Sequence, residues 1–335
     1  MKKILITGGA GYIGSHTAVE LVKSGYEPII LDDLSNSNEK VLSNLKDLVG
    51  KELSFYKGDC NDRDILNKIN SEHELSGVIH FAAFKAVGES TKLPLKYYQN
   101  NLGSLLVLLQ FMQDNHIKDL VFSSSCTVYG QPDVLPVTEL TPRKEAESPY
   151  GNSKKVCEDI LIDFVKSKPG IRVISLRYFN PIGAHPSSKI GELPIGTPAN
   201  LIPFVTQTAA GIREKLTVFG DDYDTPDGSC IRDFIHVMDL ADAHVKTLAY
   251  LNKQEIDFYD VFNVGTGNGN TVLEVLNTFE KVTGVKVNYQ IGPRREGDVV
   301  KIWADTEKIN TVFGWKPSYT LENSLRDSWN WQKTL

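Results

Sequence analysis

Short apolar runs rich in β-branched residues alternate with longer helical patterns through the first half of the chain. Runs of this kind are typical of strands in a buried parallel sheet. The strands predicted in this way are residues 4–6, 28–31, 53–55, 78–81, 120–122 and 173–176. The first helices predicted between them are residues 14–24, ended by Gly25, 39–48, ended by Gly50, and 62–70. This alternation predicts an α/β fold with a doubly wound parallel sheet.

The pattern changes after Asn180, because residues 181–198 are rich in proline and glycine and have no usable period. We therefore expect one domain over residues 1–180 and a second, smaller α/β lobe over 181–335, with some later segments returning to the first domain. The strands and helices predicted in this second part include 216–219, 237–251, 261–264 and 272–283.

Composition narrows the classes of function. The net charge of −6 offers no basic surface to nucleic acid or to an anionic membrane. No signal peptide is recognisable at the N-terminus, and the most apolar helical candidate, residues 102–112, is far shorter than the roughly 18 apolar residues of a membrane span. The four cysteines lie far apart and the seven histidines form no metal-binding spacing. We therefore expect a cytoplasmic protein without a structural metal.

A glycine-rich loop follows the first predicted strand and opens the first helix. Gly8, Gly11 and Gly14 permit a tight turn and a close approach of the backbone to a pyrophosphate, and the helix N-terminus supplies amide donors. A simple glycine turn is the alternative interpretation. Asp32 closes the second strand, where a carboxylate accepts the adenosine ribose hydroxyls of NAD and repels the 2′-phosphate of NADP. The pattern therefore favours NAD.

The third and fourth strands also end in candidate cofactor contacts. Gly58-Asp59 follows the third strand and Phe81-Ala82 belongs to the end of the fourth. Both lie at carboxyl strand ends, where the adenine and pyrophosphate of a dinucleotide bind in such sheets. Turn formation alone is the alternative role for Asp59.

A Tyr-x-x-x-Lys set occurs at Tyr150 and Lys154, and the glycine loop has GxxGxxG rather than GxGxxG spacing. Together these features resemble the extended short-chain dehydrogenase/reductase superfamily. In that superfamily a serine at the end of the fifth strand completes a triad, and within residues 123–125 the best match is Ser125. The resemblance implies that Ser125, Tyr150 and Lys154 are catalytic.

The chemistry of these three residues supports that role. A free phenol has a pKa near 10, so Tyr150 needs a cation to act as a base at neutral pH. On a helix that starts near Pro149, Tyr150 and Lys154 share a face, which brings the ammonium beside the phenol or the nicotinamide ribose. The positive nicotinamide ring lowers the pKa of Tyr150 further. Ser125 can bridge the substrate hydroxyl and the phenol.

Six motifs extend the resemblance over essentially the whole chain. They are residues 84–90, 123–130, 148–154, 176–181, 183–186 and 293–298. All six resemble the UDP-glucose 4-epimerase family. The resemblance implies interconversion of UDP-galactose and UDP-glucose on tightly held NAD, with transient oxidation at sugar C4, rotation of the 4-keto sugar and return of the hydride. It also implies a homodimer through helices near residues 97–115 and 153–166.

The residue patterns and the resemblance together assign two sets of contacts. Residues expected against NAD are Gly8, Gly11, Tyr12, Ile13, Gly14, Asp32, Asp33, Asn36, Ser37, Asp59, Cys60, Phe81, Ala82, Lys85, Asn100, Tyr150, Lys154 and Tyr178. Residues expected against the UDP-sugar are Lys85, Ser125, Tyr150, Phe179, Asn180, Asn200, Leu201, Arg232, Arg295, Asp298 and Ile302. The guanidinium group of arginine can donate two hydrogen bonds to the oxygens of a diphosphate, and a carboxylate can accept hydrogen bonds from ribose hydroxyls. Surface ion pairing is the alternative for Arg232 and Asp298.

Two positions depart from the family pattern. Cys126 stands where many relatives have alanine or threonine, which changes local packing. Ile302 stands where relatives carry tyrosine or a smaller residue beside the sugar. Because isoleucine is intermediate in volume, we expect plain hexoses as the principal substrates and slower turnover of the N-acetylhexosamine pair.

Two other functions fit part of the sequence. A sugar-nucleotide 4,6-dehydratase shares the fold, NAD and the Tyr-Lys pair, but it has Thr-Asp-Glu where this chain has Ser125, Cys126 and Thr127, so its acidic pair is missing here. A non-catalytic NAD sensor could keep the glycine loop but has no need of the serine, tyrosine and lysine together.

Overall fold

The structure is a computed structural model that describes residues 1–295 and 297–335. Its largest sheet has seven strands in the order β11-β6-β5-β4-β1-β2-β3, and every neighbouring pair is parallel. The strands are β1 (Lys3–Thr7), β2 (Glu27–Asp32), β3 (Ser54–Lys57), β4 (Gly77–His80), β5 (Asp119–Ser125), β6 (Arg172–Tyr178) and β11 (Tyr259–Val264). The predicted doubly wound α/β fold is confirmed.

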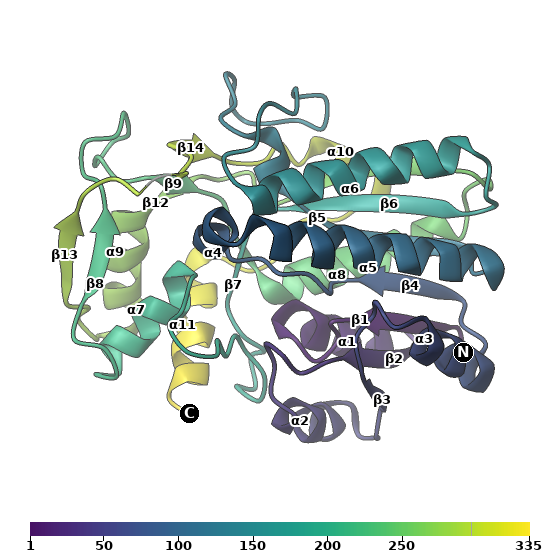
Figure 1. The fold of residues 1–335 in the computed structure, drawn as a ribbon. Helices are drawn as coiled ribbons and strands as arrows, with labels where there is room; N and C mark the ends of the chain where they lie inside the picture. Colours follow the sequence, from purple (N-terminus) through teal and green to yellow (C-terminus); the bar gives the residue numbers. More distant parts are fainter. Residues whose placement is uncertain (296) are drawn as a thin grey trace.

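Helices cover both faces of this sheet (Figure 1). Ile4 and Ile6 of β1 point into one apolar core and Leu5 into the other, as the alternation of side chains along a strand requires. The first core is closed by α1 (Tyr12–Lys23), α2 (Lys40–Val49), α8 (Val237–Leu251) and α10 (Glu307–Phe313). The second is closed by α3 (Arg63–His73), α5 (Pro94–Asp114) and α6 (Pro149–Lys166). A short helix, α4 (Val87–Lys92), leads into α5.

A smaller group of elements stands beside the sheet, at the left of Figure 1. Its helices are α7 (Leu201–Ala209), α9 (Val272–Thr283) and α11 (Leu321–Gln332), which close a third apolar core. Its strands form three small sheets. They are β7 (Asn180–Ile182) with β10 (Phe234–His236), β8 (Leu216–Phe219) with β13 (Tyr289–Gly292), and β9 (Ile231–Arg232) with β12 (Asn270–Thr271) and β14 (Lys301–Ile302).

Two segments from the second half of the chain belong to the large sheet and its helical layer. Strand β11 pairs with β6 along its whole length, from Tyr259 opposite Val173 to Val264 opposite Tyr178. Helix α8 packs on the same core as α1. Residues 237–251 and 261–264 therefore belong to the large sheet and its helical layer. The domain boundary predicted at Asn180 remains a prediction for the rest of the chain.

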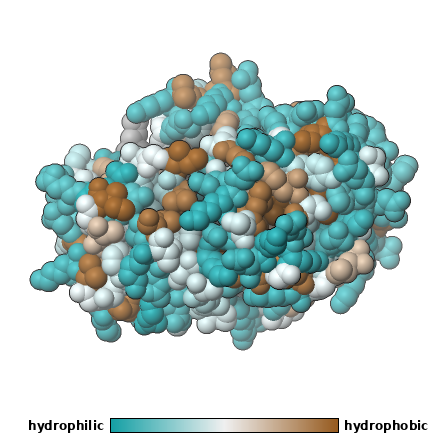
Figure 2. Space-filling model, turned by 90° about the horizontal axis from the view of Figure 1, so that it is seen from below, coloured by the Kyte–Doolittle hydropathy of each residue, from teal (hydrophilic) through white to brown (hydrophobic). Residues whose placement is uncertain are grey.

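The helices, the possible metal ligands and the surface add three observations. Within the described residues, none of the helices combines the length and apolarity that a membrane span requires. In the same residues, His, Cys, Asp and Glu form no group of three that could hold a metal ion. On the face shown in Figure 2, hydrophobic side chains form small patches separated by hydrophilic ones.

Candidate functional site

The predicted Ser–Tyr–Lys cluster, Ser125, Tyr150 and Lys154, lies at the carboxyl edge of the large sheet. Ser125 ends β5 and lies in register with Tyr178, the last residue of β6. Tyr150 and Lys154 come from the first turns of α6, which begins with Pro149 and is capped by the Ser148 hydroxyl accepting from the Gly151 amide at 3.1 Å. The Lys154 amine donates to the Ser123 carbonyl at 2.7 Å, which ties the helix to the strand end.

Burial dominates the electrostatics of this cluster. It raises the pKa of Tyr150 to about 12, an effect that the Ser125 hydroxyl partly offsets. Burial also lowers the pKa of Lys154 to about 8, opposed by the neighbouring Cys157 and Glu158. The lowered pKa that the sequence predicts for Tyr150 refers to the protein with bound NAD⁺ and stays a prediction for that state. In the protein by itself, desolvation of the phenolate is the largest cause and raises the pKa.

The glycine loop has the shape of a phosphate cradle. Gly8 has a φ of +71°, and a Cβ there would stand 2.9 Å from the Ala82 amide nitrogen. A Cβ on Gly14 would stand 2.3 Å from the Gly8 carbonyl oxygen. Side chains are therefore excluded at Gly8 and Gly14, and backbone amides face the space at the N-terminus of α1. Tyr12, the first residue of α1, donates its hydroxyl to the Gly183 carbonyl at 2.7 Å and thereby links this loop to the second half of the chain. Ile13 follows it, partly buried against the first apolar core.

Asp32 holds the loops that flank the cradle. Its buried carboxylate accepts from the Ala10 amide at 3.0 Å, the Leu34 amide at 2.9 Å and the Ser37 hydroxyl at 2.8 Å. A carboxylate with oxygens already fixed by three donors is pre-oriented at the end of β2, and its remaining lone pairs suit ribose hydroxyls. The residues present thus fit NAD.

The other predicted cofactor contacts divide into loop and core positions. Asp33 and Asn36 are exposed in the loop after β2. The Asp59 carboxylate accepts from the Asn61 amide at 2.8 Å and from its side chain at 2.9 Å, which is the turn role left open by the sequence. Cys60 is buried, and burial raises the pKa of its thiol to about 12. Phe81 packs on His244, 4.8 Å between ring centroids, and Tyr178 hydrogen-bonds the same imidazole.

Lys85 and Asn200 meet at a residue that the sequence analysis missed. The Glu192 carboxylate accepts from the Lys85 amine at 3.2 Å and from the Asn200 amide at 2.6 Å. Glu192 itself lies in the proline- and glycine-rich stretch, where no period marked it. Both predicted ligand contacts are therefore held together by one carboxylate, with Leu201 beginning α7 beside them.

Asn101 is a second missed residue. The Asn100 amide donates to the Asn101 side-chain oxygen at 3.1 Å, and that oxygen also accepts from the Phe84 amide at 2.9 Å. The Asn101 amide in turn donates to the Ser153 hydroxyl at 3.0 Å. Asn101 therefore fixes the loop that carries Lys85 against α6.

Arg232, Arg295 and Asp298 form an arginine cluster on the second half of the chain. Arg295 binds both Asp298 oxygens, at 2.7 and 3.0 Å, and Arg232 approaches the same carboxylate at 3.8 Å. The Arg295 guanidinium also lies 5.3 Å from the centre of the Phe219 ring. The three predicted nucleotide contacts are thus brought together, and they form the ion pairs that the alternative interpretation foresaw.

Between the two clusters lies an apolar wall. Phe179 and Ile302 are buried, 4 % and 3 % exposed, and share one core cluster with Cys126, the residue after Ser125. Ile302 pairs with Arg232 between β14 and β9, and Asn180 continues directly from Phe179 into β7. The departures at Cys126 and Ile302 therefore lie in the same wall, next to the Ser–Tyr–Lys cluster.

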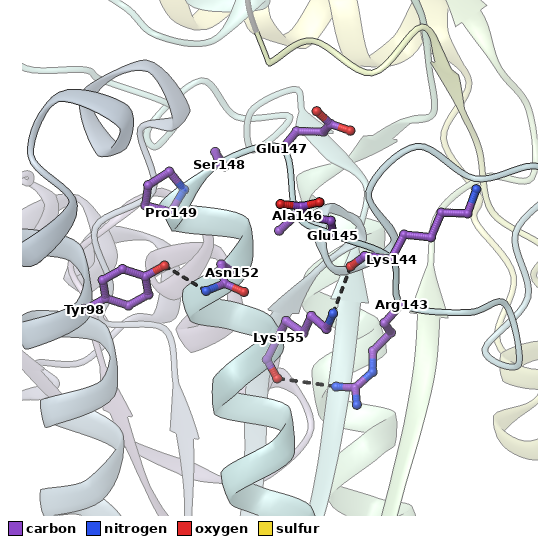
Figure 3. Close-up of a pocket in the computed structure, with 10 residues that line it drawn as sticks. All are labelled: Tyr98, Arg143, Lys144, Glu145, Ala146, Glu147, Ser148, Pro149, Asn152 and Lys155. Atoms are coloured by element: carbon purple, nitrogen blue, oxygen red, sulfur yellow. Dashed lines mark hydrogen bonds between the residues drawn. The ribbon is translucent and has the colours of Figure 1, made fainter.

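A separate pocket of about 590 Å³ opens on the outer side of α6. Figure 3 shows its lining from Tyr98, the segment 143–149 and the α6 residues Asn152 and Lys155, with Lys155 donating to the Lys144 carbonyl. Its ten lining residues include none of the predicted site residues. We therefore assign the site to the sheet edge and not to this pocket.

Comparisons with known proteins agree with this geometry. A family model described as GDP-mannose 4,6 dehydratase matches residues 5–328. The UDP-glucose 4-epimerase of Bacillus subtilis (strain 168) is 50 % identical over 332 residues, covering 99 % of this chain and 97 % of that protein. That of Erwinia amylovora is 48 % identical over 329 residues, covering 98 % and 97 %. The chain belongs to the UDP-glucose 4-epimerase family.

Solved structures of the family superpose closely. A UDP-glucose 4-epimerase from Bifidobacterium longum in complex with NAD⁺ and UDP has a TM-score of 0.96 at 44 % identity, with 99 % of this chain and 98 % of that chain covered. The UDP-Glc/GlcNAc 4-epimerase from Campylobacter jejuni has a TM-score of 0.85 at 38 % identity, with both chains covered completely.

Proposed function

We propose that this protein interconverts UDP-galactose and UDP-glucose by transient oxidation at C4 of the sugar, using tightly bound NAD. The observation that supports this best is the position of Ser125, Tyr150 and Lys154 at the sheet edge that also carries the glycine cradle and Asp32. Full-length relatives named as UDP-glucose 4-epimerases support the same reaction.

The cofactor binds along the carboxyl edge of the sheet. Backbone amides at the start of α1 would hold the pyrophosphate, and Asp32 would accept the adenosine ribose hydroxyls. When bound, the cofactor would supply a hydride acceptor as NAD⁺, with a positively charged ring, and a hydride donor as NADH. Loop and strand-end residues around the cradle, including Asp33, Asn36, Ser37, Asp59 and Phe81, complete its walls.

Tyr150 is the base in this scheme. Its phenolate takes the proton of the sugar 4-hydroxyl, and the resulting phenol returns that proton when the second epimer forms. Ser125 bridges the substrate oxygen and the phenol. Lys154 keeps a positive charge on the same face of α6, which favours the phenolate against the desolvation that raises its pKa.

The second half of the chain holds the nucleotide and leaves the sugar room to turn. Arg232 and Arg295 neutralise the diphosphate, Asp298 accepts uridine ribose hydroxyls, and Asn180, Asn200 and Leu201 line the same side. The sugar region is walled by Phe179 and Ile302, which offer shape but no hydrogen bonds. A 4-keto sugar held firmly through its nucleotide can therefore present either face to the cofactor.

The assembly is a homodimer through the outer faces of α5 and α6. Leu95 and Leu106 of α5 are 72 % and 52 % exposed, which is an apolar surface of the kind that a second copy covers. The four cysteines are buried and free, which fits a reducing compartment, and we place the protein in the cytoplasm.

The decisive experiment is to supply purified protein with UDP-galactose and no added NAD. We expect UDP-glucose to appear, and UDP-galactose to appear when UDP-glucose is supplied instead. Release of a 4-keto-6-deoxy sugar nucleotide would support the dehydratase alternative. A protein that binds NAD but never reduces it in the presence of either UDP-sugar would be a sensor, and our proposal would be wrong.

A further inference from the structure

A fully buried carboxylate lies on α6 beyond Lys154. Glu158 has no exposed surface. It accepts from the Ser124 hydroxyl at 2.6 Å and from the Arg177 guanidinium at 2.9 and 2.7 Å. A third donor, Arg143, reaches it at 3.2 Å from the pocket side of α6, where Figure 3 shows its guanidinium beside the helix. This is one of the most heavily hydrogen-bonded charges near the site, and the reaction as described does not use it.

The hydrogen bonds around Glu158 fix the chain both before and after Ser125. Ser124 is the residue before Ser125 in β5. The short 3-10 helix after Ser125, Cys126–Tyr129, ends in Tyr129, whose hydroxyl accepts from Arg177 at 2.9 Å and donates to Asn263 at 2.6 Å. The strand end is therefore clamped to α6 through Ser124 and to β6 and β11 through Arg177 and Tyr129.

The same carboxylate stands one helical turn from Lys154. Titratable groups that face Lys154 are Cys157 and Glu158 of α6, His80 of β4 and the Tyr150 phenol, while Arg177 of β6 lies behind Glu158. The other fixed contacts of the ammonium are the Ser123 carbonyl and the Phe122 ring, 4.9 Å from the ring centre. Among these groups, Glu158 is the acidic side chain, and it forms ion pairs with Arg177 and Arg143.

We propose that Glu158 is a positioning residue for the reaction, which locks the strand end carrying Ser125 against α6 and supplies the negative charge that lets Lys154 remain an ammonium. This inference rests on the proposed function. Because burial already lowers the pKa of Lys154 to about 8, loss of the carboxylate moves it further toward a neutral amine at working pH.

The test is the variant Glu158→Gln, which keeps most of the hydrogen-bonding shape and removes the charge. In protein with ¹⁵N-labelled lysine, the side-chain signal that Lys154→Arg abolishes reports the titration of Lys154 directly. We expect its midpoint to fall by about one pH unit, the lower range for a nearby opposite charge. At neutral pH we expect kcat to fall about tenfold while KM for UDP-galactose is unchanged, since none of the side chains that bind Glu158 is predicted to contact the UDP-sugar.

Two companion variants separate this role from a merely structural one. Arg143→Gln leaves the Glu158–Arg177 pair intact and should leave the Lys154 midpoint where it is. Glu158→Gln can strand Arg177 as an unpaired buried cation and unfold the protein, so the double variant Glu158→Gln/Arg177→Gln removes both charges together. It should fold, and its Lys154 midpoint should fall by less than in Glu158→Gln, because loss of the Arg177 cation offsets part of the loss of the carboxylate.

The outcomes are distinct. A Lys154 midpoint that does not move in a folded variant lacking the Glu158 charge overturns the inference. If the unsubstituted protein fails to interconvert the two UDP-sugars, the proposed function is wrong, and the titration of Lys154 still decides whether Glu158 sets its charge.

Discussion

The Ser–Tyr–Lys cluster, proposed for the chemical step, and the arginine cluster, proposed to hold the nucleotide, differ in burial and in what fixes their side chains. Ser125 and Lys154 are buried, 8 % and 3 % exposed, and are fixed by strand register and helix geometry. The side chains of Arg232, Arg295 and Asp298 are 16 %, 50 % and 13 % exposed, and they are held mainly by one another. A chemical step needs atoms placed to within a fraction of an ångström, whereas a charged ligand can be held by adaptable cations.

The two clusters also differ in how far water reaches their charged groups. In the buried cluster, desolvation sets the pKa values of both Tyr150 and Lys154, and one added charge has a large effect. Around Arg295 water and salt screen each interaction, so any single contact contributes less. Substitutions in the first cluster should therefore change kcat strongly, and those in the second should change KM moderately.

The largest effect is expected from Tyr150→Phe. It removes the proton acceptor and keeps the packing of the ring, so kcat should fall by about 10²–10⁴, the usual contribution of a positioned acid or base. Folding and NAD content should survive. The matched control is Tyr98→Phe, which removes a hydroxyl on α5 that accepts from Asn152 on the outer side of α6. Wild-type turnover in Tyr150→Phe would show that another group is the base.

Lys154→Ala should shift the pH dependence of activity. Without the ammonium the pKa of Tyr150 rises by about 1–3 units, the size of the effect of a close opposite charge, so the phenolate forms only at higher pH. The rate should therefore rise at a more alkaline pH than in the unsubstituted protein. Lys155→Ala is the control, because that amine donates to the Lys144 carbonyl on the other side of the helix. A profile that stays in place would argue against the pairing.

Asp32→Ala should weaken NAD binding by about 10–100-fold, since hydrogen bonds to a charged group contribute roughly 1.5–3 kcal/mol. It should also reduce the preference for NAD over NADP, because the carboxylate no longer repels the 2′-phosphate. Calorimetric titration of cofactor-free protein with both dinucleotides measures the ratio. Asp47→Ala, an exposed change on α2, controls for general loss of charge. If both affinities are unaltered, Asp32 has no ribose role.

Within the arginine cluster, Arg232→Gln should raise KM for UDP-galactose more than Arg295→Gln does. We expect about tenfold for the less exposed Arg232 and only a few-fold for Arg295, with added salt reducing the difference. Arg294→Gln, which breaks an exposed pair with Asp222, serves as the control. Equal effects of the three changes would remove the proposed distinction between the clusters.

The smallest predicted change concerns the range of UDP-sugars that the enzyme accepts. Ile302→Tyr adds volume to the apolar wall, and overpacking typically costs about 1–3 kcal/mol, so turnover of the N-acetylhexosamine pair should drop by about tenfold or more relative to the plain hexoses. The measurement is kcat/KM for both pairs. Ile302→Leu keeps the volume and should keep the ratio. If the ratio of kcat/KM between the two pairs is unchanged in Ile302→Tyr, this wall does not determine which UDP-sugars are accepted.

Much of the architecture could be predicted because it depends on local patterns. Buried parallel strands are continuous apolar runs, and the glycine loop must follow the first of them, so both were readable from residues 4–14. The spacing of Tyr150 and Lys154 placed them on one face of a helix, and α6 begins at Pro149 as predicted.

The parts that were missed depend on partners far away in the chain. Glu192 meets Lys85 across 107 positions, and Asn101 meets Ser153 across 52, so no local period could reveal them. The effect of burial on the pKa of Tyr150 could not be predicted from local sequence either, because desolvation depends on everything packed around the phenol. The strands of the small sheets in the second half have two to four residues, and only β8, residues 216–219, was predicted from its pattern.

The pairing of β11 with β6 has a consequence for folding of the chain during its synthesis. A ribosome that has released the first 180 residues has delivered six strands of the sheet, but the outer edge of β6 still presents unpaired amides and carbonyls flanked by apolar side chains. That edge is covered only when residues 259–264 emerge. Nascent chains stalled in this interval should therefore be the species most prone to aggregate and most in need of a chaperone.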